Sequence, residues 1–388
     1  MQLYIHVPFC RKKCAYCAFY SVPLPSDRAG ADMARRYLTG LLGELRLWAD
    51  RIGNRPVETI FFGGGTPSML PARAVAGILE AAAKHFAVDP AAEITAEANP
   101  DSALADGWLF EARQAGVNRL SLGVQSFDDR RLALLGRAHD ARTAEAAVHT
   151  ARSAGFTNLS LDLMWGLPGE PGRPQAQMQW LAELERALEL RPEHVSAYGF
   201  TLEDDTPMAR ECGEGRYSLP DEKAAASMYL AGAEYLQSRG YMQYEISNYA
   251  RMGFECRHNL GYWQGADYLG IGPGATSTLE GRRWTNPCDL DAWAEKVRAA
   301  SIGDDAEQLD DAALRKERVM LALRTVKGLS LAEWKQRHGG DFLKDHAPLV
   351  ALLQKEGLAA TRQGRFRLTR TGMLVSDSIL AHFFERLG

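Results

Sequence analysis

The chain of 388 residues is long enough for one large domain and a smaller one. Hydrophobic residues make up 46% and charged residues 24%, an ordinary composition for a folded globular protein that argues against disorder. With 45 Lys and Arg against 49 Asp and Glu, the net charge of −4 creates no positive field, so we do not expect nucleic acid as a partner.

The sequence has no charged and apolar leader, and no apolar run long enough to cross a bilayer. It has six cysteines, three of them clustered near the start. This usage is typical of metal ligands in a reducing compartment rather than of a disulfide framework. We therefore expect a cytoplasmic protein.

In the first half, short apolar runs alternate with amphipathic helical stretches, which predicts a parallel sheet covered by helices. The six expected strands are Leu3 to Val7, Thr59 to Phe62, Ile94 to Glu97, Arg119 to Gly123, Leu159 to Asp162 and His194 to Tyr198. Periodicity alone is compatible with an open partial barrel or with a doubly wound sheet. In either fold the carboxyl ends of the strands share one rim, where residues distant in sequence meet.

Three cysteines, Cys10, Cys14 and Cys17, follow the first strand in a CxxxCxxC pattern. Iron-sulfur clusters normally take four thiolates, so three leave one iron to be completed by a ligand from outside the protein. Zinc sites prefer paired Cys or His ligands, and the other cysteines, at 212, 256 and 288, are scattered. The pattern predicts a [4Fe-4S] cluster with an open iron.

The second and third strands are also followed or ended by unusual residues. The run from Gly63 to Pro67 (GGGTP) permits positive φ and close approach to a ligand, and Thr66 adds a hydroxyl. A tight strand-to-helix turn is the alternative explanation for the glycines. Glu97 would be costly to bury unpaired, so it is either a partner for a cationic ligand or a solvated strand end.

The run from Leu3 to Cys10 (LYIHVPFC), the cysteine triplet and GGGTP together resemble radical S-adenosylmethionine (SAM) proteins of the coproporphyrinogen dehydrogenase type. The resemblance implies a partial (β/α)6 barrel in which SAM chelates the fourth iron and is cleaved to a radical. It implies SAM contacts at the cluster from Tyr4, Gly64 and Glu97. It also implies a second SAM site formed by Tyr16, Gly65, Thr66, Gln125, Arg137 and Asp162.

Two departures argue against dehydrogenation of coproporphyrinogen. The dehydrogenases usually have a fourth cysteine two residues after the third, where this chain has Phe19. They also have a substantial segment before the first strand, where this chain has Met1 and Gln2.

The downstream run from His258 to Trp263 (HNLGYW), followed by a glycine-rich run to Gly274, resembles radical-SAM haem chaperones of the HemW type. His258 offers an axial imidazole, while Tyr262 and Trp263 offer flat surfaces to a macrocycle. A packed, hydrogen-bonded histidine is the alternative. Cys256 is a parallel candidate for a thiolate haem ligand, with a small buried cysteine as the plainer interpretation.

The C-terminal part is predicted to be a separate unit with three helices. The first covers Ala312 to Leu323, the second begins at Leu331, and the third lies near Pro348 to Glu356. A hairpin of Leu358 to Thr361 and Arg365 to Leu368 follows, and this order resembles a winged helix. Its arginines suit a docking surface or a cap over the barrel better than phosphate binding. The expected domains are a barrel at 1–205, a haem-motif extension at 206–300 and the C-terminal unit at 301–388.

By resemblance, the expected function is that of a haem chaperone that delivers haem to apo-haemoproteins of a respiratory chain. Peripheral membrane association and a homodimer are both compatible with that function. The alternatives are an oxygen-independent coproporphyrinogen dehydrogenase, and a radical SAM methyltransferase or haem-degrading enzyme.

Overall fold

The six expected strands form one parallel sheet in which their order along the sheet follows the chain. The computed structural model describes residues 1–387. The strands are β1 (Gln2–Val7), β4 (Pro56–Gly64), β5 (Ala87–Ala98), β6 (Arg119–Gln125), β7 (Leu159–Trp165) and β8 (His194–Gly199). Each contains the residues from which it was predicted.

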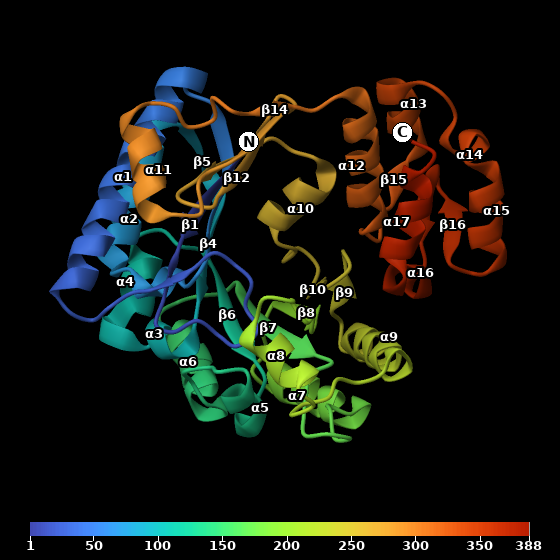
Figure 1. Cartoon of the computed structure of the whole chain (residues 1–388), viewed down its shortest axis with the longest axis horizontal. Coiled ribbons are helices and arrows are strands. Elements are labelled where there is room, and N and C mark those ends of the chain that lie inside the picture. Colours follow the sequence, from blue (N-terminus) through green and yellow to red (C-terminus); the bar gives the residue numbers. More distant parts are fainter. Residues whose placement is uncertain (388) are drawn as a thin grey trace.

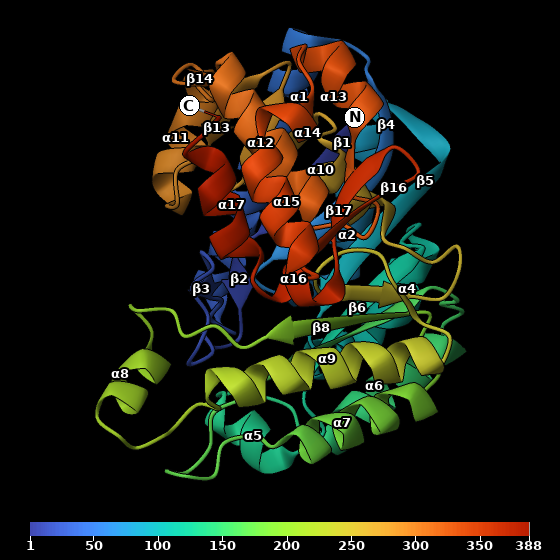
Figure 2. The ribbon, with the colours of Figure 1, turned by 90° about the vertical axis from the view of Figure 1, so that its right-hand side faces the viewer.

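The strand order distinguishes the two predicted architectures. A doubly wound sheet reverses its order at a switch point, whereas here each new strand is added on the same side of the last. The helices therefore cover the outer face: α1 (Arg28–Ile52), α2 (Ala72–His85), α4 (Trp108–Gln114), α6 (Ala141–Ser153) and α7 (Gln177–Glu189) (Figures 1 and 2). β1 and β8 do not pair with each other, so the barrel is open, and the partial-barrel prediction is confirmed.

The sheet continues beyond both ends of the predicted barrel, to twelve strands. On the β1 side it adds β11 (Tyr268–Ile271), parallel to β1, and then β12 (Thr276–Leu279), β13 (Arg282–Thr285) and β14 (Glu307–Gln308). On the β8 side it adds β10 (Asn248–Ala250) and β9 (Met242–Gln243). β14 thus belongs to the large sheet although it lies beyond residue 300.

Alternation along β1 separates the core from the barrel interior. Leu3, Ile5 and Val7 are fully buried in the main hydrophobic core. Tyr4 and His6 point to the opposite face, where they line a cavity. Because side chains alternate along a strand, one short segment serves both the core and the site.

The C-terminal unit has its own core, built around Phe342, Phe366 and Phe383. The expected helices are present as α12 (Asp311–Leu323), α13 (Leu331–His338) and α15 (Ala347–Lys355), and the hairpin as β16 (Ala359–Arg362) and β17 (Arg365–Leu368). Not predicted were β15 (Leu329–Ser330), α14 (Phe342–Asp345), α16 (Arg370–Leu374) and α17 (Ser376–Phe384). The unit stands beside the barrel in Figure 1, and its likeness to a winged helix stays a prediction.

Within residues 1–387, every helix is too short or too polar to cross a bilayer. The helix that carries the HNLGYW run, α10 (Arg257–Gln264), lies between the barrel and the C-terminal unit (Figure 1).

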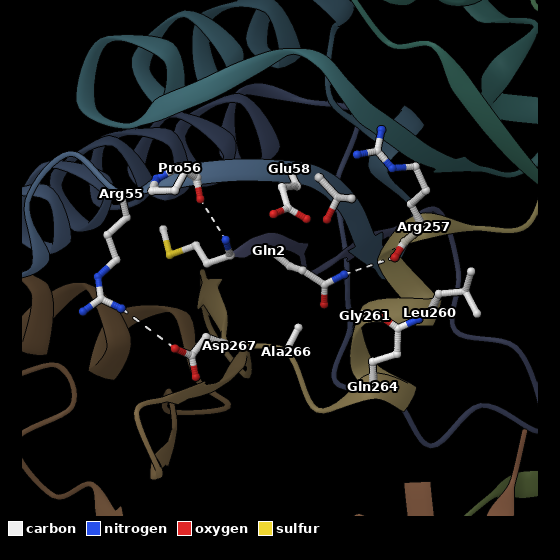
Figure 3. A pocket seen from close by; sticks show the side chains of 12 residues that line it. Gln2, Arg55, Pro56, Glu58, Arg257, Leu260, Gly261, Gln264, Ala266 and Asp267 are labelled. Atoms are coloured by element: carbon white, nitrogen blue, oxygen red, sulfur yellow. Dashed lines mark hydrogen bonds and ion pairs between the residues drawn. The ribbon is translucent and has the colours of Figure 1, made fainter. Parts of the chain in front are cut away.

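Helix α10 packs closely on the amino end of β1. Gln2 Nε2 donates a hydrogen bond to the carbonyl oxygen of Arg257 at 3.3 Å (Figure 3). It donates another to the carbonyl oxygen of His258 at 2.7 Å. A Cβ at Gly261 would lie 2.0 Å from Gln2 Nε2, so a larger residue would displace the Gln2 amide from these hydrogen bonds. A pocket of about 420 Å³ beside the contact lies at the opposite ends of the strands from the cysteines.

Replacing Gly261 should therefore separate α10 from β1. We expect Gly261→Ala to lower the free energy of unfolding by roughly 1–3 kcal/mol, because the added methyl group overpacks a buried contact. Urea unfolding followed by circular dichroism measures this. Gly77→Ala is the matched control: Gly77 is also helical, a Cβ there would meet nothing within 4 Å, and its replacement should be neutral or stabilising. Equal stability of the two variants would contradict the close contact.

Candidate functional site

The three cysteines lie on residues 10–17, the cysteine segment, which follows the carboxyl end of β1. Cys10 ends the short strand β2 (Phe9–Cys10), and Cys14 and Cys17 follow within the next turn. All three are free thiols and partly exposed. Backbone bonds from Ala15 N to Leu135 O (3.1 Å) and from Met208 N to Ala15 O (2.9 Å) fix the segment on the rim.

This donor set suits a cluster better than a single metal ion. Within residues 1–387, no three His, Cys, Asp or Glu side chains converge where they would share one ion. In an iron-sulfur cluster each thiolate binds a different iron, so the thiolates need not meet at one point. Three free cysteines on one rim segment therefore fit a [4Fe-4S] cluster.

A chain of hydrogen bonds joins two of the cysteines through Thr66 and Asn99, which follow β4 and β5, and Arg137, which follows helix α5 (Asp129–Leu134). Thr66 Oγ1 donates to Cys10 Sγ at 3.5 Å, and Asn99 Nδ2 donates to Thr66 Oγ1 at 3.1 Å. Arg137 Nη2 donates to Asn99 Oδ1 at 2.6 Å, and Nη1 donates to Cys14 Sγ at 3.5 Å. These hydrogen bonds fix the positions of two of the three sulfur atoms relative to the barrel rim.

Arg137 thus belongs to the rim, although its position in the sequence is also typical of a solvated arginine. It donates as well to the Gly123 carbonyl at 2.7 Å. Asn99 was not predicted as a site residue. The available signal was its place directly after the third strand, beside Glu97.

The glycine loop is shaped by its contact with β1. Gly65 N donates to Val7 O at 2.8 Å, and Thr66 N donates to Phe9 O at 2.7 Å. A Cβ at Gly65 would lie 2.7 Å from Phe9 O, and one at Gly64, which has φ of 105°, would lie 2.5 Å from the His6 ring. Close backbone packing therefore requires these two glycines whether or not a ligand binds.

Two carboxyl groups, Glu97 and Asp162, face the barrel interior. Burial, followed by the neighbouring Asp162, raises the pKa of Glu97 to about 8. Among the described residues, Glu97 has no ion-pair partner within 4 Å. A carboxyl group that is partly shielded from water and lacks a cation is costly to ionise, so Glu97 fits a cationic ligand.

Asp162 does not end its strand as expected. β7 continues to Trp165 because residues 163–165 still pair with β8. Ser121 Oγ donates to both carboxyl oxygens of Asp162 at 3.0 Å, and Ser160 Oγ donates to one at 3.2 Å. Asp162 therefore has hydrogen-bond partners within the sheet, and burial raises its pKa.

The remaining predicted SAM residues lie on the same rim or just inside it. Tyr16 lies beside Arg137 and packs on Phe200, with ring centroids 6.2 Å apart. Gln125 ends β6 with φ of 65°, an unusual backbone conformation for a residue other than glycine. Tyr4 lies deeper, with its hydroxyl 3.1 Å from His6 Nδ1.

The predicted haem ligand His258 is buried, with 1% of its surface exposed. Its Nδ1 lies 2.7 Å from Thr59 Oγ1, and its Nε2 lies 3.0 Å from the Tyr262 hydroxyl one helical turn later. Burial, with a smaller effect from Arg119, lowers its pKa to about 3, so the imidazole is neutral. Both ring nitrogens are thus engaged, and ligation of iron would require one hydrogen bond to break.

Cys256 precedes α10 and is fully buried. Its Sγ lies 3.5 Å from Glu93 Oε1, and the Glu93 carboxylate also accepts the backbone N–H groups of Arg257 and His258, both at 3.1 Å. Burial raises the pKa of Cys256 to about 12. This geometry favours the plainer interpretation, a packed cysteine, over a thiolate ligand.

A cavity of about 1070 Å³ lies between the cysteine segment and α10. Ala18, Phe19 and Tyr20, directly after the cysteines, line one part of it. Tyr262 and Trp263 line another, and α12 of the C-terminal unit contributes Met320 and Leu321. Its size is at the upper end of small-molecule sites, so it could hold a large, partly apolar ligand.

Comparison with protein families places two models on the chain. The Radical SAM superfamily model matches residues 4–180, which run from β1 through β7, five of the six barrel strands, to the start of α7. The HemN C-terminal domain model matches residues 309–375, from the start of α12 to the end of α16.

Several characterised proteins are similar over most of the chain. The protein named Heme chaperone HemW of Mycobacterium tuberculosis (strain ATCC 25618 / H37Rv) is 36% identical over 379 residues, which span 97% of this chain and 93% of that protein. The mitochondrial Radical S-adenosyl methionine domain-containing protein 1 of Bos taurus is 37% identical, covering 99% and 87%. Heme chaperone HemW of Escherichia coli (strain K12) is 40% identical, covering 71% and 69%.

Among solved structures, coproporphyrinogen III oxidase (HemN) from Escherichia coli, described as a radical SAM enzyme, superposes with a TM-score of 0.82. The match covers 98% of this chain and 89% of that one at 24% identity, and it shows a shared fold. With the sequence similarity over nearly the full length, the chain belongs to the HemW family of radical SAM proteins.

Proposed function

We propose that this protein is a cytoplasmic haem chaperone that binds haem and delivers it to apo-haemoproteins such as those of a respiratory chain. It carries a [4Fe-4S] cluster on Cys10, Cys14 and Cys17, and it binds SAM. The observation that carries the proposal is the large cavity, which has the residues that directly follow the three cysteines at one side and the HNLGYW helix at another. The names of the similar proteins support the same function.

The chain's own residues have separate tasks in this scheme. A bound cluster supplies redox chemistry and an open iron. Thr66 and Arg137 hold the thiols of Cys10 and Cys14 in place. Glu97 offers a negative charge to the cationic part of SAM. Tyr262 and Trp263 offer aromatic surface to the macrocycle.

Cluster ligation can be tested by comparing two cysteines. Cys14→Ser should lose the brown iron-sulfur absorbance of anaerobically reconstituted protein, because serine replaces a thiolate ligand. Cys212→Ser is the control, since Cys212 is a free cysteine on α8 (Pro207–Gly213) and lies outside both the cysteine segment and the large cavity. An unchanged spectrum and iron content in Cys14→Ser would contradict the ligand assignment.

Glu97 should make SAM binding depend on pH. Below about pH 8 its carboxyl group is mainly protonated in the free protein, and it must ionise to pair with a cation. We expect the affinity for SAM to rise roughly tenfold between pH 6.5 and 8.5 and then to level off. Isothermal titration calorimetry measures this, and Glu97→Gln should bind more weakly without that rise. A pH profile unaltered by the substitution would exclude Glu97 as the partner.

Haem ligation by His258 can be separated from its packing role. In an anaerobic haemin titration followed by the Soret band, His258→Ala should weaken binding about tenfold or more, through loss of the axial nitrogen. Tyr262→Phe keeps the aromatic surface but removes the hydroxyl that occupies Nε2, so it should bind haemin as tightly as wild type or tighter. Binding that is indifferent to His258 would make this residue structural, and no saturable binding by wild type would contradict the chaperone function.

A further inference from the structure

A second, basic pocket lies next to the large cavity, where α10 meets the C-terminal unit. Its volume is about 560 Å³. Four cationic side chains line it: Arg318 from α12, Lys327 from the following loop, Arg337 from α13 and Arg365 from β17. We call it the arginine pocket.

Positive charge exceeds negative charge in the arginine pocket. Glu255 and Glu333 are its only acidic lining residues in the described part of the chain. Glu333 lies 3.1 Å from Arg318 and 3.9 Å from Arg365, so one carboxylate is shared between two guanidinium groups. Lys327 and Arg337 have no ion-pair partner within 4 Å among residues 1–387. In a chain with a net charge of −4, such a local excess needs an explanation.

The pKa of Arg318 responds to this crowding. It is lowered, first by burial and then by the like charges of Arg337 and Arg365, although Glu333 opposes the change. A bound anion would relieve this repulsion. The guanidinium of Arg318 also donates to the carbonyl oxygen of Gln264 at 3.1 Å, which fixes the pocket to the last residue of α10.

Trp263 lines both the large cavity and the arginine pocket, so the two are adjacent. The large cavity has no comparable set of cations. Its Arg283 is paired with Glu317, and its other charged lining residues are Glu245 and Asp267. A ligand with an apolar body and an acidic edge could therefore place its body in the large cavity and its acidic edge in the arginine pocket, on either side of Trp263.

We propose that the arginine pocket holds the propionate carboxylates of haem while the macrocycle lies in the large cavity against Trp263. Haem has this division, with a planar apolar ring and two carboxylates on one edge. Arginine is well suited to the carboxylates because its planar group donates two parallel hydrogen bonds. This inference rests on the proposed function and adds how the chaperone orients its cargo.

The test compares haemin with haemin dimethyl ester, in which both carboxylates are blocked, on the reconstituted full-length protein. The variant is the double substitution Lys327→Gln and Arg337→Gln, because both side chains are exposed and unpaired and their loss should spare the fold. Arg362→Gln is the control, an exposed arginine on β16 outside the pocket.

We expect the double variant to bind haemin about tenfold more weakly, and Arg362→Gln to bind it as wild type does. The ester should bind equally to all three proteins. High salt should weaken binding of haemin by wild type more than binding of the ester, because the contacts are partly exposed charges.

The outcomes separate this inference from the proposed function. If wild type fails to bind haemin at all, both are overturned. If wild type binds haemin and the ester equally tightly, and the double variant binds haemin as tightly as wild type does, only the arginine pocket is excluded. If the double variant keeps haemin affinity but loses affinity for a poly-glutamate peptide that wild type binds, the pocket receives an acidic protein segment and the inference is also overturned.

Discussion

The pairing of β1 with β4 on one side and β11 on the other is the constraint on which both parts of the site depend. The carboxyl end of β1 continues into the cysteine segment, and its amino end receives α10 through Gln2. Between these ends, Tyr4 and His6 line the large cavity. Six residues thus set the distance between the cysteines and the HNLGYW helix.

The barrel was predictable because its strands are buried on both faces and show as apolar runs. β11 was missed because Gly270 and Gly272 indicate a loop. Gly270 is instead required within the strand, since a Cβ there would lie 2.2 Å from Thr276 O. The convergence of Cys10 and Thr66 followed from their places after parallel strands, whereas Arg137 was expected at the site from the family resemblance alone. Asn99, which joins Thr66 to Arg137, lacked a motif of its own.

Only one of the two side-chain contacts of His258 could be predicted from the sequence. The helical spacing places Tyr262 one turn from His258, and the structure has that contact. The partner of the other ring nitrogen, Thr59, lies 199 residues away in sequence, so no local pattern reveals it. The same imidazole that makes a suitable iron ligand therefore also joins α10 to β4. Any iron that it binds must displace one of these two hydrogen bonds, which contributes about 0.5–1.5 kcal/mol.

The position of β11 has a consequence for how the protein is made. β1 occupies residues 2–7, but the strand that covers its second edge begins only at residue 268. During synthesis β1 must remain an unprotected sheet edge until about two thirds of the chain has left the ribosome, and such edges are prone to pair with other chains. The cysteine segment, Thr66, Asn99 and Arg137 all precede that point. The nascent chain therefore completes its cysteine rim before it can enclose the cavity.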